Sequence, residues 1–166
     1  RFRLSSLEPI ELTPRLLELY QDDRMCPHFH MSIQSANTNV LHQMKRKYGQ
    51  KEVLHSLNEI SKKIKNPFVG MDVIAGFPTE TADEFEDTYR ALAETPWTRM
   101  HVFPYSERNG TKAGAMETQI PWNQRLDRAE KLRSLSLHRY QSEALAQMNT
   151  IKKVLVMKSS AKGVDG

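Results

Sequence analysis

Hydrophobic residues follow two periods along the chain, one typical of strands and one typical of helices. Short apolar runs predict strands at residues 1–7, 28–33, 68–75 and 100–105. Stretches with helical spacing follow each run, and they predict helices from Thr13, from about Asn39, from about Lys51, over 82–94 and over 121–148. Because strand and helix alternate four times, the sequence predicts parallel β–α–β units, which make about half of a barrel.

The run at 68–75 is the feature around which the other predicted elements are arranged. It is apolar apart from Gly70 and Asp72, which is typical of a strand covered on both faces. Thr81 followed by Glu84 is the capping-box pattern that opens a helix. A carboxylate inside such a strand costs several kcal/mol unless it is paired or bound. Asp72 is therefore expected to have a partner or a ligand.

The last sixteen residues differ from the rest of the chain. Residues 154–157 form an apolar run that predicts a strand, and residues 158–166 are expected to be a frayed tail. The chain begins directly in a strand-like run, and the apolar run near its end has no later partner in the sequence. We therefore expect an excised piece of a longer protein.

Composition limits the function classes. At 166 residues with 27% charged and 39% hydrophobic residues, the chain is expected to form one globular domain, cytoplasmic and without membrane contact. Cys26 is the only cysteine, which excludes an internal disulfide. A metal site of Cys26, His28 and His30 is an alternative to ordinary strand histidines. The net charge of +4 permits a polyanionic partner without demonstrating one.

Polar residues follow each predicted strand at its carboxyl end. Parallel α/β folds bind their ligands at this edge of the sheet. Hydroxyl, amide and carboxylate groups together suit a hydroxyl-rich ligand such as a ribose, although the same residues could instead cap helices and turns. The residues are Ser5, Ser6 and Glu8; Gln34 and Ser35; Asp72, Gly76 and Glu80; and Tyr105, Ser106 and Arg108.

Five segments, in this order and spacing, resemble the radical S-adenosylmethionine methylthiotransferases. The run 101–106 looks most like the branch that acts on threonylcarbamoyl-adenosine beside the tRNA anticodon. The branches that act on isopentenyl-adenosine in tRNA and on a ribosomal protein are its nearest relatives, and they remain alternatives. The five segments are 3–9, 28–35, 44–48, 72–81 and 101–111.

This resemblance implies an α/β fold, with residues 1–150 as the second half of a TIM-like (β/α)6 radical S-adenosylmethionine partial barrel. Residues 151–166 would be a tail or the start of a small TRAM-like RNA-binding domain. The parent enzyme would bind S-adenosylmethionine and 4Fe–4S clusters, whose cysteine ligands are not in this chain. Its partners would be tRNA and the missing half of the barrel. The isolated piece is expected to be inactive and could self-associate.

The resemblance also implies which residues bind the cofactor. Gln34 and Asp72 would bond the ribose hydroxyls, since an amide and a carboxylate can each accept a hydroxyl proton. Arg46 would hold the methionyl carboxylate with its planar guanidinium. Ser6 and Glu8 would reach the amino or ribose groups.

Further residues would contact the adenine and the substrate. Ile74 would pack against the adenine, and Tyr105 and Arg108 lie in a loop expected at the mouth of the site. Arg108 could meet a phosphate or the carboxylate of a threonylcarbamoyl group. Alternatively, Arg108 would only tie its own loop to Glu107 or Asp72.

The sequence departs from the family pattern at two positions that usually carry glycine, where Ala36 and Thr79 stand. Two other function classes are less well supported. A cluster-free aldolase-like barrel would need a lysine at a strand end, and an RNA-binding module without catalysis would show paired aromatic residues on a sheet face. Basic residues of the last helix could contact RNA phosphates or form a solvated face: Arg125, Arg128, Lys131, Arg133 and Arg139.

Overall fold

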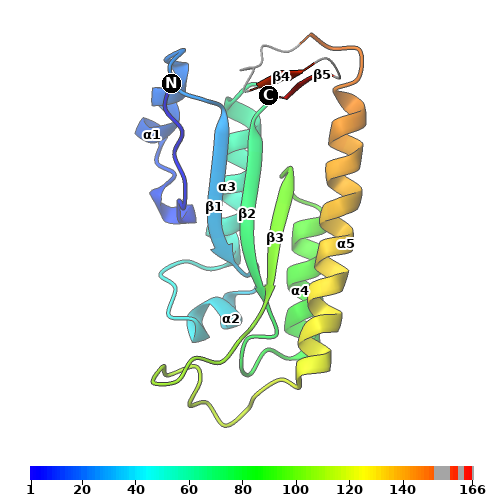
Figure 1. Ribbon diagram of the computed structural model, residues 1–166. Coiled ribbons are helices and arrows are strands. Elements are labelled where there is room, and N and C mark those ends of the chain that lie inside the picture. The colour runs from blue at the N-terminus through cyan, green and yellow to red at the C-terminus, as the bar shows by residue number, and fades with distance from the viewer. Residues whose placement is uncertain (152–157, 161–162, 166) are drawn as a thin grey trace.

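The computed structural model describes residues 1–151, 158–160 and 163–165 (Figure 1). Short 3₁₀ turns at Pro9–Glu11 and Leu19–Gln21 flank the first helix. In chain order the helices and strands are α1 (Pro14–Glu18), β1 (His28–Gln34), α2 (Thr38–Gln43), α3 (Gln50–Lys63), β2 (Phe68–Ala75), α4 (Ala82–Ala93), β3 (Arg99–Pro104), α5 (Trp122–Ala146), β4 (Lys158–Ser160) and β5 (Gly163–Asp165).

Three strands form one parallel sheet in the order β1–β2–β3. The strands predicted at 28–33, 68–75 and 100–105 are therefore confirmed, with shifts of one residue at their ends. The strand predicted at 1–7 is wrong. This segment makes only two single bridges, Phe2 to Met25 and Leu7 to Met31. Ser6 has a φ of 60°, which interrupts the extended backbone between the two bridges.

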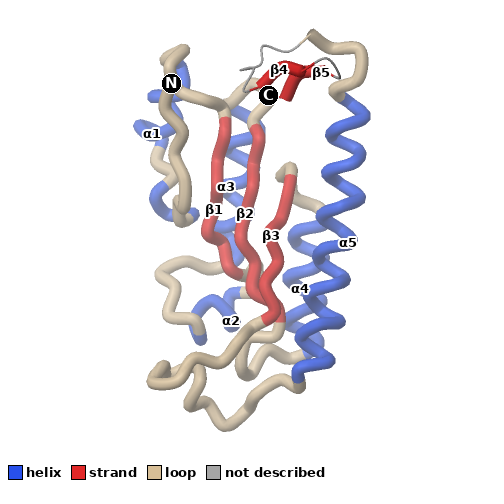
Figure 2. Tube along the Cα trace, viewed as in Figure 1, coloured by secondary structure: helices blue, strands red, loops and turns tan. Residues whose placement is uncertain are grey.

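Helices cover one face of this sheet, whereas the face turned toward the viewer in Figure 2 is open along the strands. The sequence prediction that residues 68–75 are covered on both faces is therefore wrong: Asp72 and Ile74 are only half-buried, on the open face. On the covered face the strands and helices share one core, formed by Phe29, Met31, Ile33, Val53, Leu57, Ile60, Val69, Met71, Val73, Ala75, Phe85, Leu92, Met100, Val102, Ala129 and Leu132.

The helix starts follow the capping residues seen in the sequence. The Thr13 hydroxyl accepts the N–H of Leu16 at 3.2 Å, which confirms a helix start after Thr13. Thr81 and Glu84 form the expected capping box, with bonds of 3.2 and 2.9 Å, at the start of α4. The chain thus leaves β2 in a fixed turn.

The two ends of the sheet differ. The carboxyl ends of the strands lie at the end that carries α2 and the loop 105–121, in the lower part of Figure 1. Residues 158–160 and 163–165 pair as antiparallel strands β4 and β5, so a frayed tail is wrong for these six residues. The apolar run 154–157 lies outside the described residues. The division into domains at residue 150 stays a prediction.

Candidate functional site

A pocket of about 470 Å³ opens at the carboxyl edge of the sheet. Residues from all three strands and from the loop after β3 line it. Five of the eight residues predicted to bind cofactor or substrate line this pocket. The first and last of the five, Gln34 and Arg108, are 74 positions apart in the sequence. The lining residues are Gln34, Asp72, Ile74, Phe103, Pro104, Tyr105, Ser106, Arg108, Thr111 and Ala113.

The backbone holds Gln34 in the pocket by a turn that ends β1. Gln34 has a φ of 64°, and the pairing register of β1 with β2 shifts between Met31 and Gln34. Ser35 is fully buried, and its hydroxyl lies 3.1 Å from the Thr88 hydroxyl of α4 while accepting the N–H of Asn37 at 3.1 Å. Ser35 therefore stabilises the turn, and only Gln34 of this pair faces the pocket.

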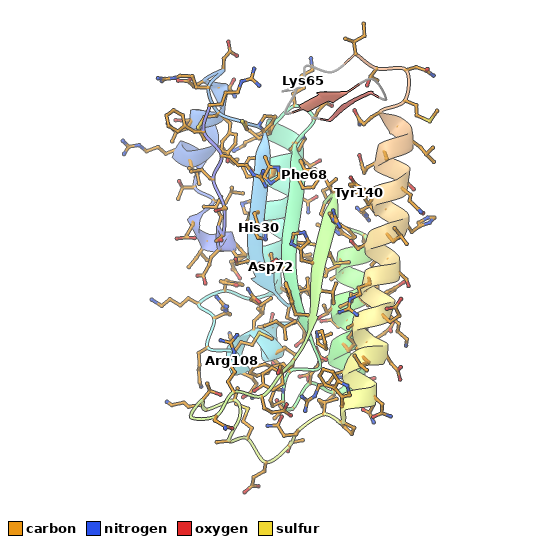
Figure 3. All side chains as sticks on the ribbon, viewed as in Figure 1. His30, Lys65, Phe68, Asp72, Arg108 and Tyr140 are labelled. Atoms are coloured by element: carbon orange, nitrogen blue, oxygen red, sulfur yellow. The ribbon has the colours of Figure 1, made fainter. Side chains whose placement is uncertain are left out.

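The Asp72 carboxylate has histidine partners on both sides, as Figure 3 shows for His30. Its Oδ1 lies 2.9 Å from Nε2 of His30 on β1 and 3.4 Å from Nδ1 of His101 on β3. These contacts supply the partner that a carboxylate inside a strand was expected to need, because an unpaired buried charge is costly. This group could not be predicted from the sequence, because His101 is 71 positions from His30 and the strand register that brings them together depends on the fold.

The metal site suggested from Cys26, His28 and His30 does not form. His28 stacks on Phe68, with 4.7 Å between ring centroids, whereas the three clustered donor residues are His30, Asp72 and His101.

Tyr105 forms the wall of the pocket next to α5. Its ring packs edge-on against Phe77 with 5.3 Å between centroids, and its carbonyl accepts from Nη1 of Arg125 at 3.0 Å. Burial, and then the charge of Glu107, raise the pKa of the Tyr105 phenol. The ring therefore stays a neutral phenol, suited to packing and hydrogen bonding.

Arg108 is exposed at the mouth of the pocket (Figure 3). The alternative that it ties its loop to Glu107 or Asp72 is wrong. Glu107 pairs with Nη2 of Arg125 at 2.5 Å, and Asp72 pairs with His30. Within the described part of the chain, the Arg108 guanidinium makes no hydrogen bond or ion pair, so it is available to an anionic ligand.

Arg46 and Glu8 meet at a second pocket of about 490 Å³, which they line with Met44 and residues near them in sequence. Nη1 of Arg46 lies 2.5 Å from Oε1 of Glu8. The backbone turn at Lys45, with a φ of 60°, brings Arg46 to this position. Met44 packs on a small apolar cluster of Val40, Phe77 and Tyr105, on which Ile74 of the first pocket also packs. Both pockets therefore border the same cluster.

Three residues from the predicted strand ends have other positions. Ser6 is exposed and lines neither pocket. Glu80 is buried in an ion pair with Arg128, and its Oε2 accepts the N–H of Gly76 at 2.8 Å. Gly76 has a φ of 73°, and a Cβ there would lie 2.6 Å from Cγ of Arg125. Glu80 and Gly76 thus fix the loop after β2 rather than bind a ligand.

Four arginines of α5 hold the helix against the sheet layer. Arg125 and Arg128 pair with Glu107 and Glu80, and Arg133 donates to the Val102 carbonyl at 3.1 Å. Arg139 donates to the carbonyls of Ala93 and Thr95 and lies over the Trp97 ring at 4.3 Å. Arg125 and Arg128, whose side chains are 4% and 12% exposed, are therefore not part of a freely solvated face, and contact of this helix with RNA stays a prediction.

A parallel sheet with helices on one face and a ligand-sized pocket at its carboxyl edge defines an α/β partial barrel. The model of the radical SAM superfamily matches residues 5–92, and the chain belongs to that superfamily. Two solved structures share the fold: coproporphyrinogen III oxidase of Escherichia coli (TM-score 0.68, 20% identity, 82% of this chain and 32% of that chain) and Elp3 of Methanocaldococcus infernus (TM-score 0.60, 14% identity, 81% and 32%).

Curated relatives are more similar in sequence. The threonylcarbamoyladenosine tRNA methylthiotransferase MtaB of Bacillus subtilis is 40% identical over 82% of this chain and 30% of its own length. The protein of the same name from Rickettsia prowazekii is 42% identical over 80% of this chain and 32% of its own length. The tRNA-2-methylthio-N(6)-dimethylallyladenosine synthase of Clostridium tetani is 33% identical over 80% and 29%. The chain thus spans about a third of the length of these relatives.

Membership of the superfamily implies S-adenosylmethionine and a 4Fe–4S cluster. The first pocket combines an amide, a carboxylate and the apolar Ile74, which suits a nucleoside. Cys26 is the only cysteine among the 166 residues, so this chain cannot supply three cysteine ligands to a cluster. No helix in the described part of the chain is both long and apolar enough to cross a bilayer.

Proposed function

We propose that this chain is part of a radical SAM methylthiotransferase that inserts a methylthio group into threonylcarbamoyl-adenosine of tRNA. The identities of 40% and 42% with proteins named for that reaction support the proposal, against 33% for the named dimethylallyladenosine enzyme. We further propose that the protein works in the cytoplasm. Its partners would be tRNA and the polypeptide that completes the barrel.

The observation that carries the proposal is the convergence of Gln34, Asp72, Ile74, Tyr105 and Arg108 on one pocket. The resemblance of the sequence to the methylthiotransferases implies that each of these residues contacts a cofactor or a substrate. A pocket of about 470 Å³ is within the usual range of about 300–1,000 Å³ for small-molecule sites.

The residues of the pocket bind and orient the cofactor. When bound with its iron–sulfur cluster, S-adenosylmethionine supplies the radical that abstracts hydrogen from an aromatic carbon. The amide oxygen of Gln34 and the free Oδ2 of Asp72 accept hydrogen bonds from ribose hydroxyls, while Oδ1 of Asp72 stays with His30. Ile74 offers an apolar surface to the adenine.

The Glu8–Arg46 pair suits the methionyl end of the same cofactor. That end is a zwitterion, so a carboxylate and a guanidinium side by side can bind its ammonium and carboxylate groups respectively. Both side chains are about one-third exposed, at 32% and 30%, and can therefore be reached from solvent. Ser6, which is exposed beside this segment, remains a proposed contact to the amino or ribose groups.

The open face of the sheet supports the proposed partner. Phe103 on β3 is 52% exposed on that face, and an apolar sheet face of this kind is normally covered. We propose that the remaining strands of a (β/α)6 partial barrel cover it in the parent protein. In their absence, two copies of this chain would associate through it.

The test of the proposed function uses the enzyme that contains this chain. Deleting its gene should remove the methylthio group from threonylcarbamoyl-adenosine in total tRNA, measured by mass spectrometry of nucleosides. Arg46→Ala should weaken S-adenosylmethionine binding about 10- to 100-fold, the equivalent of a lost charged hydrogen bond. Arg24→Ala is the matched control, because it removes an arginine–carboxylate pair of similar length, 2.6 Å against 2.5 Å, outside both pockets. Unchanged tRNA after deletion would refute the proposal.

A further inference from the structure

The open face of the sheet carries one cluster of metal-binding side chains, made of His30, Asp72 and His101. The residues come from three neighbouring strands, β1, β2 and β3. Asp72 and His101 are paired directly across the β2–β3 register, and His30 lies on the same face of β1. One donor atom from each of the three residues lies within 4.8 Å of the other two.

We propose that these three side chains bind one divalent transition-metal ion of the zinc class. Two imidazoles and a carboxylate are a common ligand set for such ions, and three protein ligands leave a position for water or substrate. The proposed ion and the ribose of the proposed cofactor site would both use Asp72. The proposal does not involve the iron–sulfur clusters that the superfamily implies.

The two distances from Oδ1 of Asp72 are within the range found between ligands of one ion, and the donor nitrogens of the two histidines lie within 4.8 Å of each other. With metal–ligand bonds of about 2.0–2.1 Å, two ligands of a tetrahedral ion lie about 3.3–3.4 Å apart, and adjacent ligands of an octahedral ion about 2.9 Å apart. Oδ1 of Asp72 is 2.9 Å from the first histidine nitrogen and 3.4 Å from the second. Small side-chain rotations would therefore be enough to surround an ion.

A hydrogen-bond network alone explains less of this arrangement. A carboxylate can pair with two imidazoles through its two oxygens, but here both rings approach Oδ1. Oδ2, Nδ1 of His30 and Nε2 of His101 have no hydrogen-bond partner among the described residues. With the ion bound, those two ring nitrogens would carry the protons, and both rings would be neutral.

The exposure of the cluster suits an ion with an open coordination position. In the isolated chain the side chains of His30, Asp72 and His101 are 25%, 23% and 48% exposed. An ion can therefore enter from solvent and keep water ligands wherever the rest of the barrel or a second copy leaves this part of the face open. The rings of His30 and His101 are 5.6 Å apart at an interplanar angle of 65°, which lets their nitrogens converge without stacking.

The experiment is calorimetric titration of the chelator-treated 166-residue chain with Zn²⁺, in the absence of S-adenosylmethionine because the ribose would compete for Asp72. We expect one ion per chain. Removing a residue that only hydrogen-bonds to a metal ligand costs about 10- to 100-fold in metal affinity. Replacing a ligand itself should cost more, so we expect binding at least about 100-fold weaker in each of His30→Gln, His101→Gln and Asp72→Asn. Co²⁺ should give a visible absorption band that the same variants lose.

His28→Gln is the matched control, because His28 lies on the same face of β1 but stacks on Phe68 outside the cluster. It should bind Zn²⁺ as the parent chain does. Circular dichroism identifies any variant that fails to fold. If His30→Gln fails to fold, the test rests on His101→Gln, whose position is exposed. No Zn²⁺ binding by the parent chain, or equal binding by the folded His101→Gln variant, would overturn the proposal. Neither result bears on S-adenosylmethionine binding, which Arg46→Ala tests separately.

Discussion

Nη1 of Arg128 lies 2.6 Å from Oε2 of Glu80, and the two side chains are 12% and 2% exposed. The same nitrogen donates to the Glu80 carbonyl at 2.9 Å. Burial raises the pKa of the Glu80 carboxyl, whereas the hydrogen bond and charge of Arg128 act in the opposite direction. Arg128 thereby joins α5 to the loop that follows β2 and carries Gly76.

Arg128→Ala should lower the free energy of unfolding by about 3–5 kcal/mol, because it leaves Glu80 buried without its partner. Urea denaturation followed by circular dichroism measures the change. Glu130→Gln on the same helix is the control. It removes an exposed pair whose atoms are 3.9 Å apart, and it should change stability by less than about 1 kcal/mol. A loss below about 1 kcal/mol in Arg128→Ala would show that the buried pair does not hold the loop.

Thr79 is in a backbone conformation that favours glycine, with a φ of 73°. It stands at one of the two positions where the family usually carries glycine. A β-branched residue there costs about 1–3 kcal/mol in strain, and glycine costs about 0.5–1 kcal/mol in chain entropy. Thr79→Gly should therefore raise the free energy of unfolding by about 1 kcal/mol, measured as an increase in the urea midpoint.

Ala36, at the other such position, provides the contrast. It is fully buried and its φ is not positive, so glycine relieves no strain there. Ala36→Gly should destabilise the chain by roughly 1–2 kcal/mol through lost methyl burial and added chain entropy. If both glycine variants destabilise, the strain assigned to Thr79 is absent.

The pair between Glu107 and Arg125 predicts a dependence of stability on pH. The hydrogen bond from Arg125 lowers the pKa of Glu107 from 4.5 to about 2. A carboxyl whose pKa is lower in the folded state contributes stability above its unfolded pKa. That contribution should be lost as the pH falls from about 4.5 to about 2.

Thermal denaturation of the parent chain and Glu107→Gln between pH 6 and pH 2.5 tests this prediction. The difference in melting temperature between the two proteins should shrink as the pH falls through that window. Asp22, whose pKa Arg24 also lowers to about 2, is unchanged in both proteins and cancels in the comparison. A constant difference in melting temperature across this pH range would mean that Arg125 does not lower the pKa of Glu107 in the folded chain.

The sequence predicted most of the fold because strand and helix periods are local properties. The limits of 68–75 and the capping box at Thr81 follow from neighbouring residues alone. The strand at 1–7 failed because the positive φ of Ser6 leaves no mark in a pattern of apolar residues. The ion pairs of Arg125 and Arg128 could not be predicted for a similar reason, since their partners Glu107 and Glu80 lie on loops distant in sequence.

The site was predicted in part, through the rule that parallel strands bind ligands at their carboxyl ends. That rule predicted that Gln34, Asp72 and Tyr105 lie close together, and all three line one pocket; that they bind a ligand stays a prediction. It could not show that the Asp72 carboxylate pairs with His101 as well as His30, because the contact with His101 depends on the register between β2 and β3. Register is set by packing across the whole sheet and cannot be read from one strand.

The last prediction concerns Arg108 and the substrate of the enzyme that contains this chain. Since Glu107 and Asp72 have other partners, the Arg108 guanidinium can contact an anionic group bidentately, and a threonylcarbamoyl carboxylate or a tRNA phosphate provides one. Arg108→Glu should reduce methylthiolation of tRNA by at least about 100-fold, because it removes a charged hydrogen bond and adds repulsion. Cleavage of S-adenosylmethionine without substrate should change little.

Lys112→Glu is the control, because it makes the same charge change in the same exposed loop but outside the pocket lining. If Arg108 makes a specific contact, the effect of Lys112→Glu should be much smaller. Equal losses in the two variants would indicate a general attraction for RNA, and loss of both reactions in Arg108→Glu would place Arg108 at the cofactor instead.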